Sequence, residues 1–329
     1  MASFDVMPDV QLYQPVELAD ALSLADQLGP DGWLLGGGQD TYGWLKDRAK
    51  QPRAMIDLNG IEALHGIRDT DDGIEIGAAT TLHEIIRDER INRDYSLLAD
   101  AAGTVASPQI RNVGTLGGNL VQDARCWYYR RGLDCYRAGG NTCYAGSPGA
   151  MNREHCVLGA SRCVAVSSSD TGMALVALDA TMVVQSVNGQ RTIAAEDFFV
   201  GPNTRITQMT SLEAGEILIA IRVPSKWAGK KFYFEKVADR DVWDFALVSI
   251  AVAMSMDGNT IADSRFVCGG VACTPHRLTN IERAARGKAL SDDSADAVAP
   301  LASEGAEPLN YNHFKLPLME NLVRRAMRS

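Results

Sequence analysis

Five of the seven cysteines in this 329-residue chain fall within one short segment, where their thiols could bind a metal centre. They are Cys126, Cys135, Cys143, Cys156 and Cys163. Thiolates that lie close together repel one another, so a cation must neutralise them. The spacing C-x8-C-x7-C-x12-C-x6-C differs from the C-x2-C pairs of zinc ribbons and from a bacterial ferredoxin run. Spacing alone favours an iron–sulfur cluster, with zinc and free or disulfide-paired thiols as the alternatives.

Two glycine-rich segments could approach a phosphate group. Gly36-Gly37-Gly38 follows an apolar run, and a second segment extends from Gly114 to Asn119. Without Cβ atoms, glycines let backbone N–H groups converge on an anion and let phosphate come close. Neither segment has the G-x-G-x-x-G pattern or the P-loop lysine pattern. Two such loops suit a dinucleotide with a diphosphate, although each alone is equally consistent with a tight turn.

No set of residues typical of a nucleophilic or metal-dependent hydrolase is present. The five histidines are isolated from one another, and His276 in Thr-Pro-His-Arg is interpreted as the start of a helix. We therefore assign no catalytic residue and expect a chain that holds cofactors without holding the substrate chemistry.

The elements that would position these residues alternate between helices and strands. Residues 121–163 show no period, which is unusual for so long a segment inside a domain and typical of a functional loop. Thr81 is predicted to cap a helix. Predicted helices cover 14–28, 96–106, 173–178, 276–287, 292–304 and 312–328; predicted strands cover 33–35, 55–58, 73–78, 181–186, 232–237 and 245–256; and 225–230 is predicted to be a linker.

Composition excludes several classes of protein. With 32 basic and 41 acidic residues, the net charge is −9, which disfavours binding to nucleic acid or to an anionic membrane surface. No apolar run is long enough for a membrane span. The first five residues lack the features of a signal peptide. We expect a cytoplasmic protein, or a periplasmic one if a partner carries the export signal.

Read together, these segments resemble the flavin subunit of the xanthine dehydrogenase and carbon monoxide dehydrogenase family of molybdenum hydroxylases. The resemblance spans nearly the whole chain in the right order. It rests on Leu35–Asp40, Ile76–Thr81, Ile110–Asn119, Ser169-Asp170 with Ala174-Leu175, the set Lys236, Arg240, Asp244 and Ala246, and Gly269–Ala272 with Pro275.

The resemblance implies an α+β fold with two domains. A bilobal FAD-binding domain of the PCMH type would occupy residues 1–225, with lobes at 1–60 and 61–225 and the cysteine-rich insertion at 121–163. A small α+β domain of the CO dehydrogenase flavoprotein C-terminal type would occupy residues 229–329.

The resemblance also implies the residues that bind FAD. Asp170 would contact the adenosine part and Lys236 would lie near the flavin ring. Gln39 stands where the family usually has threonine, which puts a side-chain contact to phosphate in doubt there. The full set is Leu35, Gly36, Gly37, Gly38, Gln39, Asp40, Thr41, Thr115, Gly117, Gly118, Asn119, Asp170 and Lys236.

The insertion is similar to the [4Fe–4S] loops of bacterial aldehyde oxidoreductase flavin subunits and of 4-hydroxybenzoyl-CoA reductase. The first type implies Cys126, Cys135, Cys143 and Cys163 as ligands. The second type would replace Cys163 with Cys156. Cys268 and Cys273 are expected to be buried thiols that bind no metal.

By this resemblance the chain is an electron-transfer subunit of a heterotrimeric oxidoreductase. A large molybdopterin subunit would oxidise the substrate, and a small subunit with two [2Fe–2S] clusters would pass electrons to this FAD. An external quinone, NAD or ferredoxin-like protein would exchange electrons with the flavin. Alternatives are a self-contained flavin oxidoreductase and a zinc-stapled scaffold subunit. Aldehydes, N-heterocycles and aryl-CoA thioesters remain open as substrates.

Overall fold

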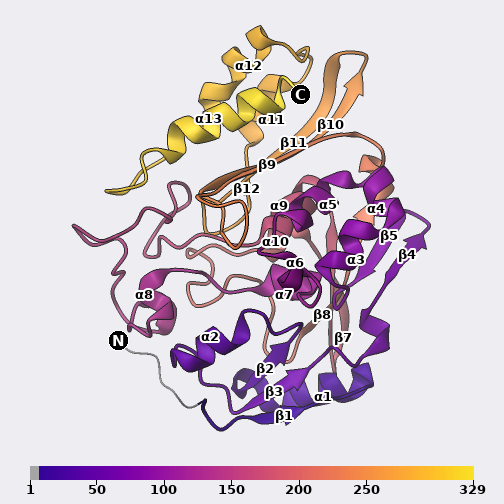
Figure 1. Ribbon diagram of the computed structural model, residues 1–329, viewed down its shortest axis with the longest axis vertical. Coiled ribbons are helices and arrows are strands. Elements are labelled where there is room, and N and C mark those ends of the chain that lie inside the picture. Colours follow the sequence, from indigo (N-terminus) through magenta and orange to yellow (C-terminus); the bar gives the residue numbers. More distant parts are fainter. Residues whose placement is uncertain (1–6) are drawn as a thin grey trace.

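Three β-sheets organise the computed structural model, which describes residues 7–329 (Figure 1). A three-stranded sheet lies at one end, a four-stranded sheet at the other, and a five-stranded sheet between them. The expectation about a signal peptide concerns residues outside the described part of the chain. Within that part, no helix has the length and apolar character needed to span a bilayer.

The first sheet is parallel and small. Its order is β1-β3-β2, formed by β1 (Gln11–Tyr13), β3 (Ala54–Asp57) and β2 (Gly32–Leu35). Parallel neighbours need a crossover connection, which α1 (Leu18–Leu28) and α2 (Thr41–Lys46) supply. The buried face of α1 packs with Ile56 of β3. The first glycine loop begins directly after β2.

The middle sheet is antiparallel, with the order β4-β5-β8-β6-β7. Its strands are β4 (Ile67–Thr70), β5 (Gly73–Gly77), β6 (Thr181–Ser186), β7 (Gly189–Ala194) and β8 (Ile217–Pro224). Helices α3 (Leu82–Arg87), α4 (Glu89–Asp94), α5 (Ser96–Gly103), α9 (Asp170–Ala177) and α10 (Ala195–Phe198) accompany it. Thr81 caps α3 in a capping box with Glu84, which confirms that prediction.

The segment between α5 and α9 contains only short elements. It has α6 (Pro108–Arg111), α7 (Leu116–Val121), α8 (Trp127–Arg130) and the 3₁₀ turn η3 (Tyr136–Ala138). From residue 139 to residue 169 the chain follows an irregular path. The absence of a sequence period between 121 and 163 therefore matches the structure.

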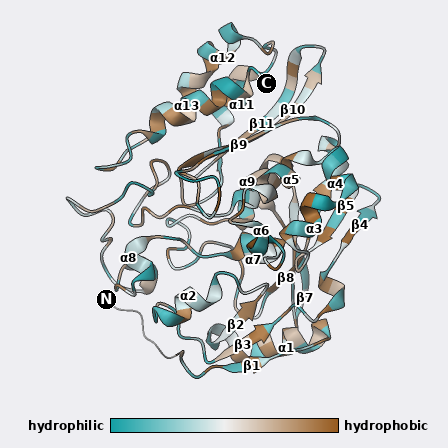
Figure 2. Cartoon of the chain, in the orientation of Figure 1, coloured by the Kyte–Doolittle hydropathy of each residue, from teal (hydrophilic) through white to brown (hydrophobic). Residues whose placement is uncertain are grey.

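The C-terminal sheet has the order β12-β11-β10-β9 and is antiparallel. Its strands are β9 (Lys231–Val237), β10 (Val248–Asp257), β11 (Thr260–Gly269) and β12 (His276–Arg277). Helices α11 (Thr279–Ala285), α12 (Asp292–Val298) and α13 (Lys315–Ala326) lie on one face of it (Figure 1). Figure 2 shows both hydrophilic and hydrophobic residues along α13, as expected for a helix with one buried face.

The prediction that His276 begins a helix is wrong. His276 and Arg277 form β12, which pairs with Cys268 and Val267 of β11. The helix begins at Thr279. These two residues form a strand because they are partly buried against the sheet. The sequence does not show this, because a helical pattern follows directly after them.

Candidate functional site

A cleft of about 570 Å³ separates the N-terminal sheet from the helices of the middle lobe. This volume lies in the range of small-molecule and cofactor sites. The residues that line the cleft include the first glycine loop, the second glycine loop with Asp123 and Arg125, residues 207–218, and Trp243 to Phe245. The two glycine-rich segments are therefore brought together, as two loops for one ligand require.

The two glycine loops also pack directly on each other. The hydroxyl of Thr115 donates to the carbonyl of Gly36 at 3.2 Å and accepts from the N–H of Gly118 at 3.1 Å. A Cβ on Gly118 would lie 2.6 Å from the Gly36 oxygen. Gly37 has φ +78°, and a Cβ there would lie 2.3 Å from the Val113 carbonyl oxygen. Glycine is thus needed for the close approach of the two loops.

The two loops differ in the N–H groups that they can offer. In the second loop, the N–H groups of Leu116 and Gly117 donate to the carbonyls of Thr80 and Ala78 at 2.9 and 2.8 Å. Those of residues 118 and 119 donate to Thr115. Within residues 7–329, by contrast, no acceptor binds the N–H groups of residues 38, 39 and 40 in the first loop. The first loop is the one that can donate to a phosphate.

The cations that line the cleft are already paired with carboxylates. Arg125 donates to Asp40, as does Arg130 from outside the cleft at 3.0 Å, and Lys50 lies 2.9 Å from Asp123. A diphosphate in this cleft would therefore depend on backbone N–H groups more than on free side-chain charge. This agrees with the unpaired N–H groups of the first loop.

Most of the residues predicted to bind FAD line the cleft. They are Gly36, Gly38, Gln39, Asp40, Thr41, Thr115, Gly117, Gly118, Asn119 and Asp170. Leu35, Gly37 and Lys236 are not among its lining residues. The side chain of Gln39 donates to the Gly37 carbonyl at 3.0 Å, which stabilises the conformation of the first loop.

Asp170, expected to contact the adenosine part, and Lys236, expected to lie near the flavin ring, are paired with each other in the structure. The ammonium group of Lys236 lies 2.7 Å from the Asp170 carboxylate, and both side chains are buried. Asp170 is part of the cleft wall, and Lys236 lies behind it, where it also donates to the Thr104 carbonyl at 3.1 Å.

Asn119 ties the second loop to α9. Its side-chain oxygen accepts from the hydroxyls of Ser169 and Thr171, at 2.7 and 2.6 Å. The Ser169 hydroxyl also caps α9 by accepting from the N–H of Gly172 at 3.0 Å. Asn119 therefore has a structural role that the motif alone did not predict.

Two parts of the cleft wall were missed by the sequence analysis. Residues 207–218 approach it from a turn at Gly215, which has φ +82° and leads into β8. Gly215 before an apolar run is the one feature of the local sequence that could have indicated this turn. Trp243 has φ +59° and is 58% exposed, and the guanidinium of Arg125 lies 4.3 Å from the Phe245 ring. No local pattern predicts these aromatic residues.

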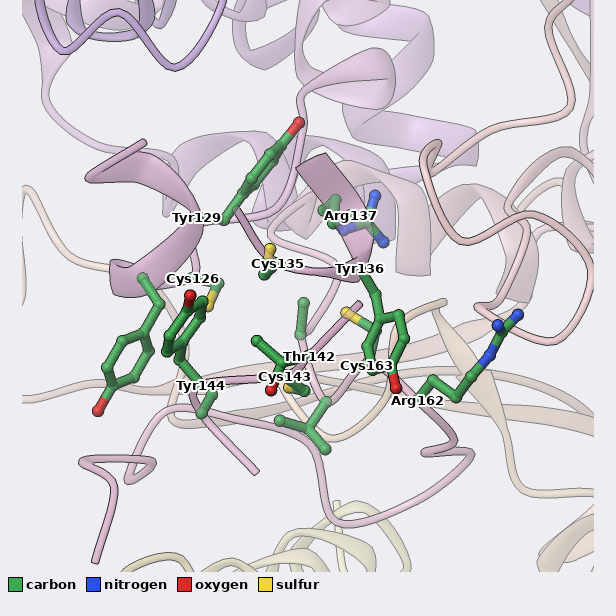
Figure 3. A pocket seen from close by; sticks show the side chains of 14 residues that line it. Cys126, Tyr129, Cys135, Tyr136, Arg137, Thr142, Cys143, Tyr144, Arg162 and Cys163 are labelled. Carbon is green, nitrogen blue, oxygen red and sulfur yellow. The ribbon is translucent and has the colours of Figure 1, made fainter. Parts of the chain in front are cut away.

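The irregular segment forms a second cavity, which four thiols line. Figure 3 shows Cys126, Cys135, Cys143 and Cys163 around one hollow, together with aromatic side chains and Arg137. Cys156 is fully buried but is not a lining residue. The fold thus brings together the set of four that ends in Cys163. Cys268 and Cys273 are buried, as expected.

The hollow is wider than a site for a single ion. Across residues 7–329, no three His, Cys, Asp or Glu side chains are grouped closely enough to hold a metal ion. The hollow has a volume of about 10 Å³, enough for roughly one water molecule. A space that admits a water keeps each sulfur roughly 3 Å or more from its centre, whereas zinc holds thiolate sulfur at about 2.3 Å.

Two of these thiols, Cys126 and Cys163, have a raised pKa, which favours their protonated form. Burial raises the pKa of Cys126 to about 11, and a hydrogen bond with Cys273, followed by burial, raises the pKa of Cys163. His155 Nε2 lies 3.2 Å from the Cys126 sulfur, and burial lowers the pKa of this histidine to about 4. Ligation of a metal centre by these cysteines would require loss of the thiol protons to solvent.

Comparisons with known proteins agree along the whole chain. The family described as the FAD binding domain in molybdopterin dehydrogenase matches residues 8–226, and the CO dehydrogenase flavoprotein C-terminal domain matches residues 232–329. The carbon monoxide dehydrogenase medium chain of Hydrogenophaga pseudoflava is 31% identical over 98% of this chain and 97% of its own length. The aldehyde oxidoreductase FAD-binding subunit of Escherichia coli is 33% identical over 94% and 95%.

Solved structures show the same fold. A structure of carbon monoxide dehydrogenase from Hydrogenophaga pseudoflava has a TM-score of 0.77 with 30% identity, over 98% of this chain and 97% of that chain. Quinoline 2-oxidoreductase from Pseudomonas putida 86 has a TM-score of 0.76 with 24% identity, over 98% and 96%. The expected α+β fold, an FAD-binding domain followed by a CO dehydrogenase flavoprotein C-terminal domain, is confirmed.

Proposed function

Since the chain belongs to the family of FAD-binding medium subunits of the carbon monoxide, xanthine and aldehyde dehydrogenases, we propose that it holds FAD in the 570 Å³ cleft and transfers electrons there. It is an oxidoreductase subunit, as its relatives are. When bound, FAD supplies redox chemistry in one- and two-electron steps. The observation that carries the proposal is the cleft between two interlocked glycine loops.

The residues of the cleft would bind and orient the cofactor. The N–H groups of residues 38–40 donate to the diphosphate, and the glycines at 36, 117 and 118 let it lie against the backbone. Asp170, held by Lys236, accepts hydrogen bonds at the cleft wall. Trp243 and Phe245 shield one side of the cleft from water.

We further propose that Cys126, Cys135, Cys143 and Cys163 hold a [4Fe–4S] cluster. The support is chemical and geometric: four thiols line one hollow, and the hollow is wider than zinc requires. Such a cluster supplies one-electron transfer. Cys156, buried beside this cavity, is the alternative fourth ligand.

The partners follow from the same proposal. A large molybdopterin subunit oxidises the substrate, and a small subunit with two [2Fe–2S] clusters delivers its electrons to this chain. A quinone, NAD or a ferredoxin-like protein accepts them, in the cytoplasm. The name "medium chain" among the relatives supports a multi-subunit assembly.

The test is the cofactor content of the chain purified without oxygen. We expect one FAD, about four irons and about four acid-labile sulfides per chain, with no zinc. FAD without iron would contradict the cluster and leave a flavin subunit with a structural loop. One zinc without flavin would contradict the whole proposal in favour of a scaffold subunit. Flavin reduction by a substrate of this chain alone would favour a self-contained flavin oxidoreductase.

A further inference from the structure

Arg137 is a buried cation in the wall of the thiol cavity. It belongs to η3, two residues after Cys135, and its side chain is only 1% exposed. Figure 3 shows it beside the cysteine side chains. Arginine keeps its charge in any protein environment, so this position places a permanent positive charge next to the thiols. Electrostatic interaction with Cys163 is part of its environment.

The hydrogen bonds of Arg137 are incomplete. Nη1 lies 3.4 Å from the Asp123 carboxylate, at the long limit of a hydrogen bond. Among the described residues, the buried Nε and Nη2 atoms make no hydrogen bond of good geometry, although the Cys163 thiol lies close enough to the guanidinium to interact with it. Buried donors are almost always satisfied in folded proteins. Two donors therefore lack a well-placed acceptor on the side where the Cys163 sulfur lies.

The charge of Arg137 is also incompletely balanced. The carboxylate paired with it, that of Asp123, already accepts from Lys50 at 2.9 Å and from the Tyr129 hydroxyl at 3.0 Å. Two cations thus share one anion, which leaves a positive charge in a place that water does not reach. Such a charge is stable when a further anion lies against it.

We infer that Arg137 donates Nε–H and Nη2–H hydrogen bonds to sulfur atoms of the cluster and thereby raises its reduction potential. The inference rests on the proposed [4Fe–4S] site. Four thiolates on a 2+ core carry a net charge of −2, and reduction by one electron makes it −3. A buried cation and N–H···S hydrogen bonds stabilise the more negative state more strongly.

Arg137 is also linked to the large cleft, because its ion-pair partner Asp123 lines that cleft. Asp123 and Lys50 both line the large cleft, whereas Arg137 lines the thiol cavity. The ionic chain Arg137–Asp123–Lys50 therefore crosses the wall between the two sites. A cation there favours the presence of an electron on the cluster side.

The test is potentiometry of the full chain followed by electron paramagnetic resonance, after iron, sulfide and FAD have been measured. Arg137→Met removes charge and donors, and Arg137→Lys keeps the charge without the planar set of donors. Arg162→Met is the matched control. It also removes an arginine that lines the hollow, but Arg162 is exposed and lies over the Tyr136 ring, where solvent screens its charge.

We expect Arg137→Met to lower the cluster potential so that the reduced-to-oxidised ratio at fixed potential falls at least tenfold, which corresponds to 59 mV for one electron. Arg137→Lys should lie between wild type and Arg137→Met, and Arg162→Met should match wild type. If Arg137→Met loses its iron, the test rests on the cluster potential of Arg137→Lys. A potential lower than that of wild type supports the inference, and an unchanged potential overturns it.

The failures of the two proposals are distinguishable. A wild-type chain that contains FAD but no iron contradicts the cluster itself. A wild-type chain with four irons, whose potential is the same in both Arg137 variants, overturns only the role of Arg137.

Discussion

At the scale of single residues, Cys156 and Cys163 differ in what surrounds them. Cys163 lines the hollow with three other thiols, whereas Cys156 packs with Ala145 and Val164. A cluster cannot keep four protein thiolates once one of its ligands is replaced by serine. We therefore expect Cys163→Ser to lose most of its iron and sulfide, and Cys156→Ser to retain about four irons per FAD.

Cys156→Ser is the matched control for that comparison, because both residues are buried cysteines of the same loop. Iron and sulfide analysis of the two variants, normalised to FAD, gives the answer. The reverse result, iron lost only in Cys156→Ser, would establish the alternative ligand set.

Gly118 tests the contact between the two glycine loops. In Gly118→Ala the added methyl group would lie 2.6 Å from the Gly36 carbonyl oxygen. Relief of this contact would require one of the two glycine loops to move, because the atom that it meets belongs to the backbone. Overpacking of this kind costs about 1–3 kcal/mol. We expect the Kd for FAD to rise about tenfold or more, measured by flavin fluorescence titration of the deflavinated chain.

Gly103→Ala is the control for that variant. Gly103 ends α5, and an added Cβ would meet nothing within 4 Å. Its affinity for FAD should equal that of wild type. Equal affinity in both alanine variants would show that the two loops can separate without cost, contrary to the geometry.

The site could be predicted from sequence only where local residues define it. The glycine loops and the cysteines are visible as residue types at recognisable spacings, and the structure brings each set together. Arg137 could not be assigned, because a surface arginine and a buried one look the same in a sequence. Its burial depends on packing around the irregular loop.

At the scale of elements, residues at the start of α13 bind the cysteine-rich segment to the C-terminal domain through hydrogen bonds. Lys315, the first residue of α13, is fully buried and donates to the carbonyls of Glu154 and Gly270, at 3.1 and 2.5 Å. Asn312, just before the helix, donates to the carbonyls of His155 and Cys156. These contacts hold the end of a loop that has little regular structure of its own.

Lys315 gives this contact a pH dependence. Burial lowers its pKa from 10.5 to about 8. The unfolded chain thus holds the proton up to about pH 10.5, whereas the folded chain releases it near pH 8. Stability supplied by this residue therefore rises as pH increases across that interval. At pH 7 the folded state carries the full cost of burying the charge.

We expect the free energy of unfolding of wild type, relative to Lys315→Met, to increase by roughly 2–3 kcal/mol at most between pH 7 and pH 10. Urea unfolding at several pH values measures this difference. Lys230→Met, which changes an exposed lysine, should show no such trend relative to wild type. A difference between wild type and Lys315→Met that does not change with pH would mean that the pKa of Lys315 is not lowered in the folded protein.

Elements with a clear period were the ones that sequence could predict. The strand at residues 181–186 matches β6, and the strand at 232–237 differs from β9 by one residue. The predicted helix at 292–304 is instead α12 followed by a 3₁₀ turn that contains Pro300. Strands β4, β7 and β8 were not predicted, because their alternation is weak or their neighbours lie far away in sequence.

At the scale of the whole molecule, the C-terminal sheet packs on both faces. Val248, Ile250 and Val252 of β10 belong to the core beneath α11–α13. Ala251 and Ala253, which alternate with them, belong to the core of the middle lobe. The second face carries small residues because α9 lies close to it, and the Ser249 hydroxyl there lies 3.3 Å from the Met173 sulfur.

The two domains therefore share a core, which has a consequence for unfolding. Separation of the C-terminal domain would expose the alanine face of β10 and the side of α9 that helps to form the FAD cleft. Release of FAD and loss of the C-terminal sheet should then occur in one transition. Residues 225–230, predicted to be a linker, begin with a 3₁₀ turn whose Trp227 is buried in the same core.

Ala251→Leu tests this coupling. A leucine against α9 forces the sheet and the helix apart, at a cost of about 1–3 kcal/mol, which should lower Tm by about 1–4 °C for a chain of this size. Circular dichroism and flavin fluorescence should report the same lowered Tm, because one core is disturbed. Ala262→Leu, on an exposed position of β11, should leave both unchanged. Flavin release at the wild-type temperature, with only circular dichroism shifted, would show that the cleft is independent of the C-terminal sheet.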